Sequence, residues 1–267
     1  MRVLRPMCVV VALVAGPAGV VMLVAPADTD SYFSWPIGPP PLAATVGSFY
    51  VASAILFAVA AARDDWFRIR GLCVGVLALT LPTILSTVYD RDVFDFGRWQ
   101  AVAWVLLFVM SPIAFSTVLF AQRRLLAPGP SALPASARSL SSVLAVGYAA
   151  LAVACWIDPE GLGSHGPFAM VSLSGRFVGS WAGFLATLAA YSVVRNRRSE
   201  AFVPALGLTI WPIAGLVAAL RSFDDLVSGA RKGIYFAVLV GLAVASASLI
   251  AATREHPPSR PETSPRS

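Results

Sequence analysis

Eight apolar runs separated by short polar segments constrain the fold of this 267-residue chain more than any other feature. Each is about 17–22 residues long, which at about 1.5 Å per helical residue matches a hydrocarbon core of about 30 Å. In lipid, backbone N–H and C=O groups must bond within the protein, so these runs are expected to be helices. The sequence therefore predicts an all-α integral membrane protein with eight transmembrane helices. The runs cover approximately residues 8–25, 42–62, 71–89, 101–121, 141–157, 173–194, 202–220 and 233–252.

The amino-acid composition also indicates that the chain folds in a lipid bilayer. Apolar residues make up 57% of the chain and charged residues only 13%, whereas about a quarter of a typical soluble domain is charged. The net charge of +6 does not indicate nucleic-acid binding, because the arginines fall in short clusters between the apolar runs. We expect the lipid bilayer to be the main partner and expect no nucleic acid.

Residues that commonly hold metals or cofactors are few. Cys8, Cys73 and Cys155 lie in or beside apolar runs without a C-x-x-C spacing, which indicates small buried side chains. Neither histidine lies within a span, so a haem held between helices is not expected. The segment Gly161–Gly166 fits G-x-G-x-x-G but follows a membrane span, so we expect a flexible loop and not a dinucleotide site. We predict no cofactor and no metal.

The charges between the runs predict the orientation. One side of the membrane would carry 14 arginines and five acidic residues, a net charge of +9. The other would carry six basic and nine acidic residues, a net charge of −3. Because positive loops stay in the cytoplasm, both termini are expected to be cytoplasmic, in the inner membrane of a bacterial cell.

The N-terminal run allows a second interpretation. Ala25-Pro26-Ala27 loosely resembles a signal-peptide cleavage site. The run is long for a signal peptide, however, and a proline occupies the site. We therefore expect this first helix to be retained, with the Trp35–Pro41 segment forming a short periplasmic loop and Pro39–Pro41 opening the second helix.

An internal repeat supports retention of the first helix. When the two halves of the sequence are aligned with an offset of about 132 residues, Val46–Ser48 matches Val178–Ser180. With an offset of 130 residues, Pro82 matches Pro212. The predicted organisation is two parallel four-helix units, which both enter the membrane in the same direction. The units span residues 1–124 and 139–253, joined by a cytoplasmic Pro/Ala/Ser-rich linker at 125–138. Residues 254–267 are expected to form a disordered cytoplasmic tail.

Small residues predict a helix-packing face. Gly175, Gly179 and Gly183 lie four residues apart in the sixth run, and Gly47 occupies the matching face of the first unit. Glycines at this spacing let another helix backbone approach closely. Two hypotheses remain open: packing within the bundle, or a homodimer seam.

The candidate polar site consists of charged residues near the side of the membrane that carries the net charge of −3. Arg176 lies near one end of its apolar run, and an arginine there either snorkels or finds a carboxylate. Its candidate partners are Asp224, Asp225 and Asp95. The acidic groups interleave with arginines in both units, which predicts either a solvated ion-paired rim or a vestibule for a cation or solute. The residues of this predicted site are Arg176, Asp95, Asp225, Arg91 and Arg221.

Tryptophans lie near many of the predicted membrane boundaries, which is typical of an aromatic belt and requires no ligand. In this interpretation each of them anchors the protein at the lipid–water interface. They are Trp35, Trp66, Trp99, Trp156 and Trp211.

The run Trp35-Pro36-x-x-Pro39, followed by Ala43 and Gly47-Ser48-Phe49, resembles a module of uncharacterised multi-pass membrane proteins of actinobacterial type. In that family a Trp-Pro loop leads into a helix with an Ala-Arg start and a Gly-Trp step that has Ala or Ser between the two residues. The second unit keeps Arg176 and Gly179-Ser180-Trp181 but lacks the Trp-Pro pair, and the first has Ala44 where the arginine would fall. The resemblance implies no activity and no catalytic residue.

These observations favour a polytopic membrane protein without enzymatic activity, acting as a structural or accessory subunit of the cell envelope. Its partners would be other membrane subunits or a second copy of the chain. A membrane enzyme is a third candidate, which would need the outward carboxylates to converge on one pocket. The main alternative is a transporter of small solutes or lipids that uses the cleft between the two repeats. That alternative predicts a polar midplane cavity lined by residues such as Ser48, Ser180 and Thr83, with helices broken at Pro82 and Pro212.

Overall fold

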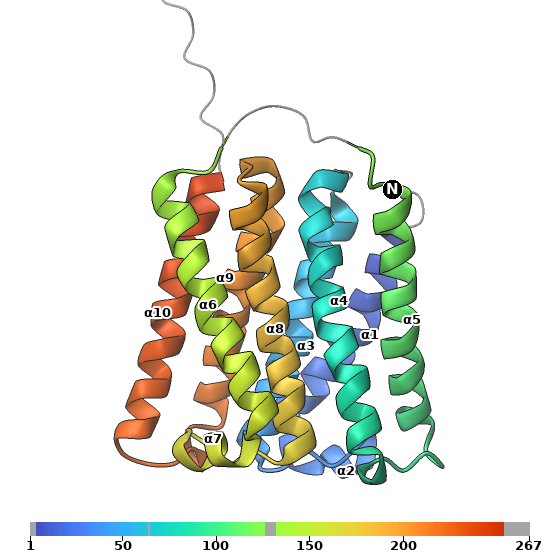
Figure 1. Ribbon diagram of the computed structural model, residues 1–267. Coiled ribbons are helices and arrows are strands. Elements are labelled where there is room, and N and C mark those ends of the chain that lie inside the picture. The colour runs from blue at the N-terminus through green and yellow to red at the C-terminus, as the bar shows by residue number, and fades with distance from the viewer. Residues whose placement is uncertain (1–3, 64, 126–131, 254–267) are drawn as a thin grey trace, which may run out of the picture.

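The computed structural model describes residues 4–63, 65–125 and 132–253. Within these ranges the chain is a bundle of long helices without a strand (Figure 1). Eight helices are long and apolar enough to cross a membrane, which confirms the predicted all-α membrane fold. They are α1 (Leu4–Val24), α3 (Pro40–Ala62), α4 (Trp66–Tyr89), α5 (Trp99–Ala121), α6 (Ala135–Ile157), α8 (Ser172–Arg195), α9 (Arg198–Arg221) and α10 (Ala230–Thr253).

Short elements connect the long helices at one end of the bundle, which we call the α7 end. They are η1 (Pro26–Asp28), α2 (Thr29–Tyr32), η2 (Arg91–Val93), α7 (Pro159–His165) and η3 (Phe223–Asp225). The start of α1 and the end of α10 both lie at the opposite end, which we call the N-terminal end (Figure 1). The predicted disordered tail at 254–267 lies outside the described residues, as do residues 126–131 of the predicted linker.

Local sequence explains where the helices begin. Pro39 caps α3, and Pro40 occupies its first turn, as the proline-rich segment predicts. The Asp65 carboxylate accepts a hydrogen bond from the backbone N–H of Phe67 at 3.0 Å and caps α4. Helix α6 begins at Ala135 and includes residues assigned to the linker from sequence, because Ala and Ser after Pro134 extend the helix beyond its apolar run.

The helices form an inner group and an outer group. Helices α3, α4, α8 and α9 are central: 67% of the most apolar stretch of α3 is buried, against 11% for α10. Each outer helix packs mainly on one inner helix: α1 on α3, α5 on α4, α6 on α8 and α10 on α9. Across the centre, α4 packs on α8 and α3 packs on α9. The core therefore lies where the two halves of the chain meet.

Candidate functional site

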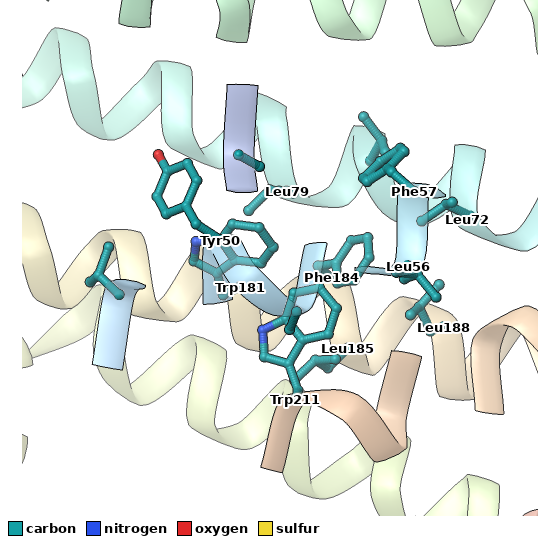
Figure 2. Close-up of a cluster of buried hydrophobic side chains, with 14 of the residues drawn as sticks. Tyr50, Leu56, Phe57, Leu72, Leu79, Trp181, Phe184, Leu185, Leu188 and Trp211 are labelled. Atoms are coloured by element: carbon teal, nitrogen blue, oxygen red, sulfur yellow. The ribbon is translucent and has the colours of Figure 1, made fainter. Parts of the chain in front are cut away.

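An aromatic core fills the junction between the two halves of the chain at the α7 end. Its residues come from α3, α5 and α8 and from the segments after α2 and after η2. They are Phe33, Trp35, Tyr50, Phe94, Trp104, Phe108, Phe177 and Trp181. All eight are buried. Figure 2 shows Trp181 between Tyr50 and Trp211, which extends the cluster to α9.

Trp35 lies at the centre of this core, so its prediction as an interfacial anchor is wrong. Only 1% of the side chain is exposed, and its ring lies 4.7 Å from that of Trp104 and 5.7 Å from that of Phe177, measured between centroids. The indole N–H donates to the hydroxyl of Ser174 at 3.1 Å. The loop folds inward because the Thr29 hydroxyl accepts from the backbone N–H of Ile37 at 2.8 Å. In the aromatic core the Trp35 ring is buried and its N–H has a hydrogen-bond partner. Together these two contributions outweigh the preference of tryptophan for the lipid–water interface.

Other tryptophans divide between core and surface. Trp211 is also buried and lies in the middle of α9, and not near a span end as predicted. Trp66 is buried at the start of α4, whereas 75% of Trp99 is exposed. Sequence position alone does not distinguish these cases, since burial depends on which helices meet beside each ring.

Arg176 forms an ion pair that joins α8 to the end of α4. Its Nη1 lies 2.7 Å from Oδ2 and 2.8 Å from Oδ1 of Asp90, and both side chains are largely buried. The guanidinium also lies over the ring of Tyr89, 5.1 Å from its centroid. The partner is Asp90 and not Asp95, Asp224 or Asp225, the three candidates from sequence. Asp90 follows the last residue of α4, and that helix packs against α8.

A second buried ionic group lies at the other end of α8. The carboxylate of Glu200 is fully buried near the start of α9. It accepts hydrogen bonds from Arg195 at 2.9 and 3.1 Å and from the hydroxyl of Tyr191 at 2.6 Å. In the sequence, Glu200 is only one of the five acidic residues between the apolar runs on the arginine-rich side. The signal that could have found it is the short connection between α8 and α9, which keeps Arg195 and Glu200 close together.

The remaining charged residues of the predicted site stay apart. Arg91 pairs with Asp92 at 3.6 Å on the exposed surface, and Arg221 donates to the backbone carbonyl of Val24 at 3.1 Å. Asp95 accepts from the backbone N–H of Gly97 at 3.0 Å, and Asp225 is exposed on η3. No hydrogen bond or ion pair between described residues joins Asp95 to Asp225. Of the two hypotheses, the geometry favours a solvated rim over a converging vestibule.

The glycine face mediates packing within the chain. A Cβ added at Gly179 would lie 2.8 Å from Cβ of Cys155, and one added at Gly47 would lie 2.7 Å from Cβ of Met22. Gly175 contacts Pro159, at the start of α7. Gly183 differs, because it lies in an open groove between α4 and α6 lined by small residues such as Ala78 and Ala152.

The Gly161–Gly166 segment is mostly helical, so the flexible loop expected there is wrong. Helix α7 covers it up to His165, capped by Asp158, whose carboxylate accepts from the backbone N–H of Gly161 at 2.8 Å. The three cysteines are buried thiols, as predicted. Within residues 4–63, 65–125 and 132–253, no three His, Cys, Asp or Glu side chains cluster as metal ligands would.

An apolar pocket of about 290 Å³ lies beside the aromatic core, and we call it the lateral pocket. Helices α6, α8, α9 and α10 surround it, and Thr45 and Phe49 of α3 form its inner wall. A smaller cavity of about 60 Å³ lies between α1, α3, α4 and α5 in the first half of the chain. Trp181 contacts both spaces and separates them.

Comparison with protein-family models, with curated proteins and with solved structures gives no match to this chain. The resemblance to multi-pass proteins with a Trp-Pro loop stays a prediction.

Proposed function

We propose that this polytopic membrane protein has a structural or accessory role in the cell envelope and carries out no enzymatic reaction. The observation that supports this most is the filled junction between the two halves of the chain. The aromatic core occupies the position at which a transporter would need a polar passage. An envelope subunit needs a stable shape within the bilayer, and a packed core with paired charges provides one.

The transport alternative has little support from the polar residues that suggested it. The hydroxyls of Ser48, Thr83 and Ser180 are buried and donate to backbone carbonyls of their own helices at 2.7–3.0 Å. Helix α4 continues through Pro82, and α9 continues through Pro212. A transport cycle would therefore have to open the aromatic core and expose hydroxyls that already have partners.

The proposed topology includes two parallel repeats with both termini in the cytoplasm. Corresponding helices make corresponding contacts: α1 packs on α3 as α6 packs on α8, and α4 packs on α5 as α9 packs on α10. The termini of the described chain lie at one end of the bundle, which is the arginine-rich end (Figure 1). The positive-inside rule then assigns that end to the cytoplasm and the α7 end to the periplasm.

Photo-crosslinking in native membranes tests the accessory role. A photo-reactive phenylalanine analogue would replace Leu106 of α5 or Val146 of α6, whose side chains are 57% and 71% exposed. Contact with other subunits predicts discrete protein adducts from at least one of these outer helices or from the equivalent faces of α1 and α10. The buried position Leu56 is the control and should give none. Lipid adducts alone at every outer position would contradict the proposal.

A further inference from the structure

The lateral pocket has a different shape from its counterpart in the first half. Counted from the starts of α5 and α10, Phe108 corresponds to Leu239 and Phe115 to Ser246. Phe108 and Phe115 line the smaller cavity and fill much of that space. The smaller side chains of α10 leave room, and the pocket of about 290 Å³ approaches the usual lower size for a small-molecule site of about 300 Å³.

The walls of the lateral pocket are aromatic. The rings come from six different parts of the fold, and they belong to Phe49, Tyr148, Phe168, Trp181, Trp211 and Tyr235. Residues after α7 close the pocket at the α7 end. Phe168 packs edge-on against Tyr235, with centroids 5.9 Å apart, and the backbone carbonyl of Pro167 accepts from the N–H of Val227 at 2.9 Å. The outer helices α6 and α10 diverge toward this end (Figure 1). Side chains of both helices line the pocket.

Hydrogen-bond donors without acceptors lie in these walls. The indole N–H groups of Trp181 and Trp211 have no partner among the described residues, but neighbouring atoms cover them, so they are not open to the pocket. Two phenols also line the pocket: the hydroxyl of Tyr148 makes no hydrogen bond to a described residue, and that of Tyr235 lies beside the hydroxyl of Thr45. A buried donor without an acceptor is costly, so a ligand that supplies oxygen acceptors would be stabilised here.

The pocket also excludes charge. Among the described residues, no Asp, Glu, Lys or Arg side chain lines it. An ionised headgroup or a free ion would therefore lose its hydration without gaining a partner of opposite charge. A suitable ligand is apolar over most of its surface and neutral, and it carries acceptor oxygens at one end.

From these features we infer that the lateral pocket binds an uncharged, membrane-soluble molecule bearing carbonyl oxygens, which enters from the bilayer between α6 and α10. The carbonyl oxygens accept from the phenol hydroxyls of Tyr148 and Tyr235, and the apolar body lies against the aromatic walls. Two sources share this chemistry: the ring of an isoprenoid quinone and the ester region of a neutral diacylglycerol. This site goes beyond the proposed envelope role, since a structural subunit does not require a ligand.

The test compares two valines of α10. Val238 lines the pocket and Val240 does not, yet 51% and 49% of their side chains are exposed. An isoprenoid naphthoquinone and a dioleoylglycerol would each be titrated into the purified full-length protein, with the bound adduct measured by native mass spectrometry. Val238→Trp should weaken binding by about tenfold or more because the indole occupies the pocket, whereas Val240→Trp should leave it unchanged.

A double variant tests the donors without changing the shape of the pocket. Tyr148→Phe with Tyr235→Phe should weaken binding by about fivefold to a hundredfold, the usual range for two lost hydrogen bonds. Adducts with the naphthoquinone alone identify a quinone, and adducts with the diacylglycerol alone identify a lipid; either supports the inference. Absence of both adducts, or equal binding by wild type, Val238→Trp and the double variant, would overturn it. If Val238→Trp does not fold, the double tyrosine variant decides the result.

Discussion

The guanidinium of Arg176 lies 2.7 Å from the carboxylate of Asp90 and joins α8 to the end of α4 at the α7 end of the bundle. At the other end of α8, Arg195 holds the buried carboxylate of Glu200. The two arginines are 19 residues apart, which corresponds to a rise of about 28 Å along the helix. That length is close to the hydrocarbon thickness of about 30 Å, so α8 is held by an ion pair near each membrane boundary.

Arg176→Gln is expected to lower the free energy of unfolding by about 1–3 kcal/mol, because it leaves the largely buried Asp90 without its charged partner. Thermal unfolding in detergent would measure the effect. Arg91→Gln is the matched control, since its pair with Asp92 is 76% and 96% exposed and should contribute under about 1 kcal/mol. Equal losses in the two variants would contradict the structural role assigned to Arg176.

Trp35→Ala is expected to destabilise the protein by about 3–5 kcal/mol, because it removes a large buried ring from the aromatic core. The smaller change Trp35→Phe should retain part of the packing but lose the hydrogen bond to Ser174. Trp99→Ala provides the comparison, as 75% of that ring is exposed. If Trp35 instead anchors the interface, the Trp35 and Trp99 variants should lose similar amounts.

Gly47→Ala is expected to cost about 1–3 kcal/mol, because the added Cβ would lie 2.9 Å from the backbone carbonyl oxygen of Gly19 and would push α1 away from α3. Gly147→Ala is the control: its added Cβ meets nothing within 4 Å, so it should be neutral or slightly stabilising. Unfolding midpoints in detergent distinguish the two. A neutral Gly47→Ala variant would mean that the close approach of these helices is not required.

The sequence predicted the eight spans well because length and hydropathy are local properties. It could not predict which side chains become neighbours. Trp35 was assigned to the interface since loop tryptophans often lie there, whereas its burial requires α5 and α8 to meet beside the loop. The partner of Arg176 was missed for the same reason. Asp90 and Asp95 are close in sequence, and only the packing of α4 on α8 determines which of them the arginine reaches.

Membrane orientation can be measured with single cysteines and a membrane-impermeant maleimide. Cysteine in place of Asp92, at the α7 end, should react in intact cells. Cysteine in place of Arg124, at the arginine-rich end, should react only after permeabilisation. The native thiols are buried and give little background. The reverse labelling pattern would contradict the cytoplasmic assignment of both termini.

The closed junction between the halves is the central claim, and cysteine accessibility at its matched serines tests it most directly. Ser48→Cys and Ser180→Cys place thiols at positions that are 0% and 1% exposed. Neither should react with a water-soluble maleimide in permeabilised native membranes, and both should react after denaturation in detergent. Cysteine in place of Asp92 serves as the reactive control. Labelling of either serine position in the folded protein would show that water reaches the junction and would contradict a sealed core.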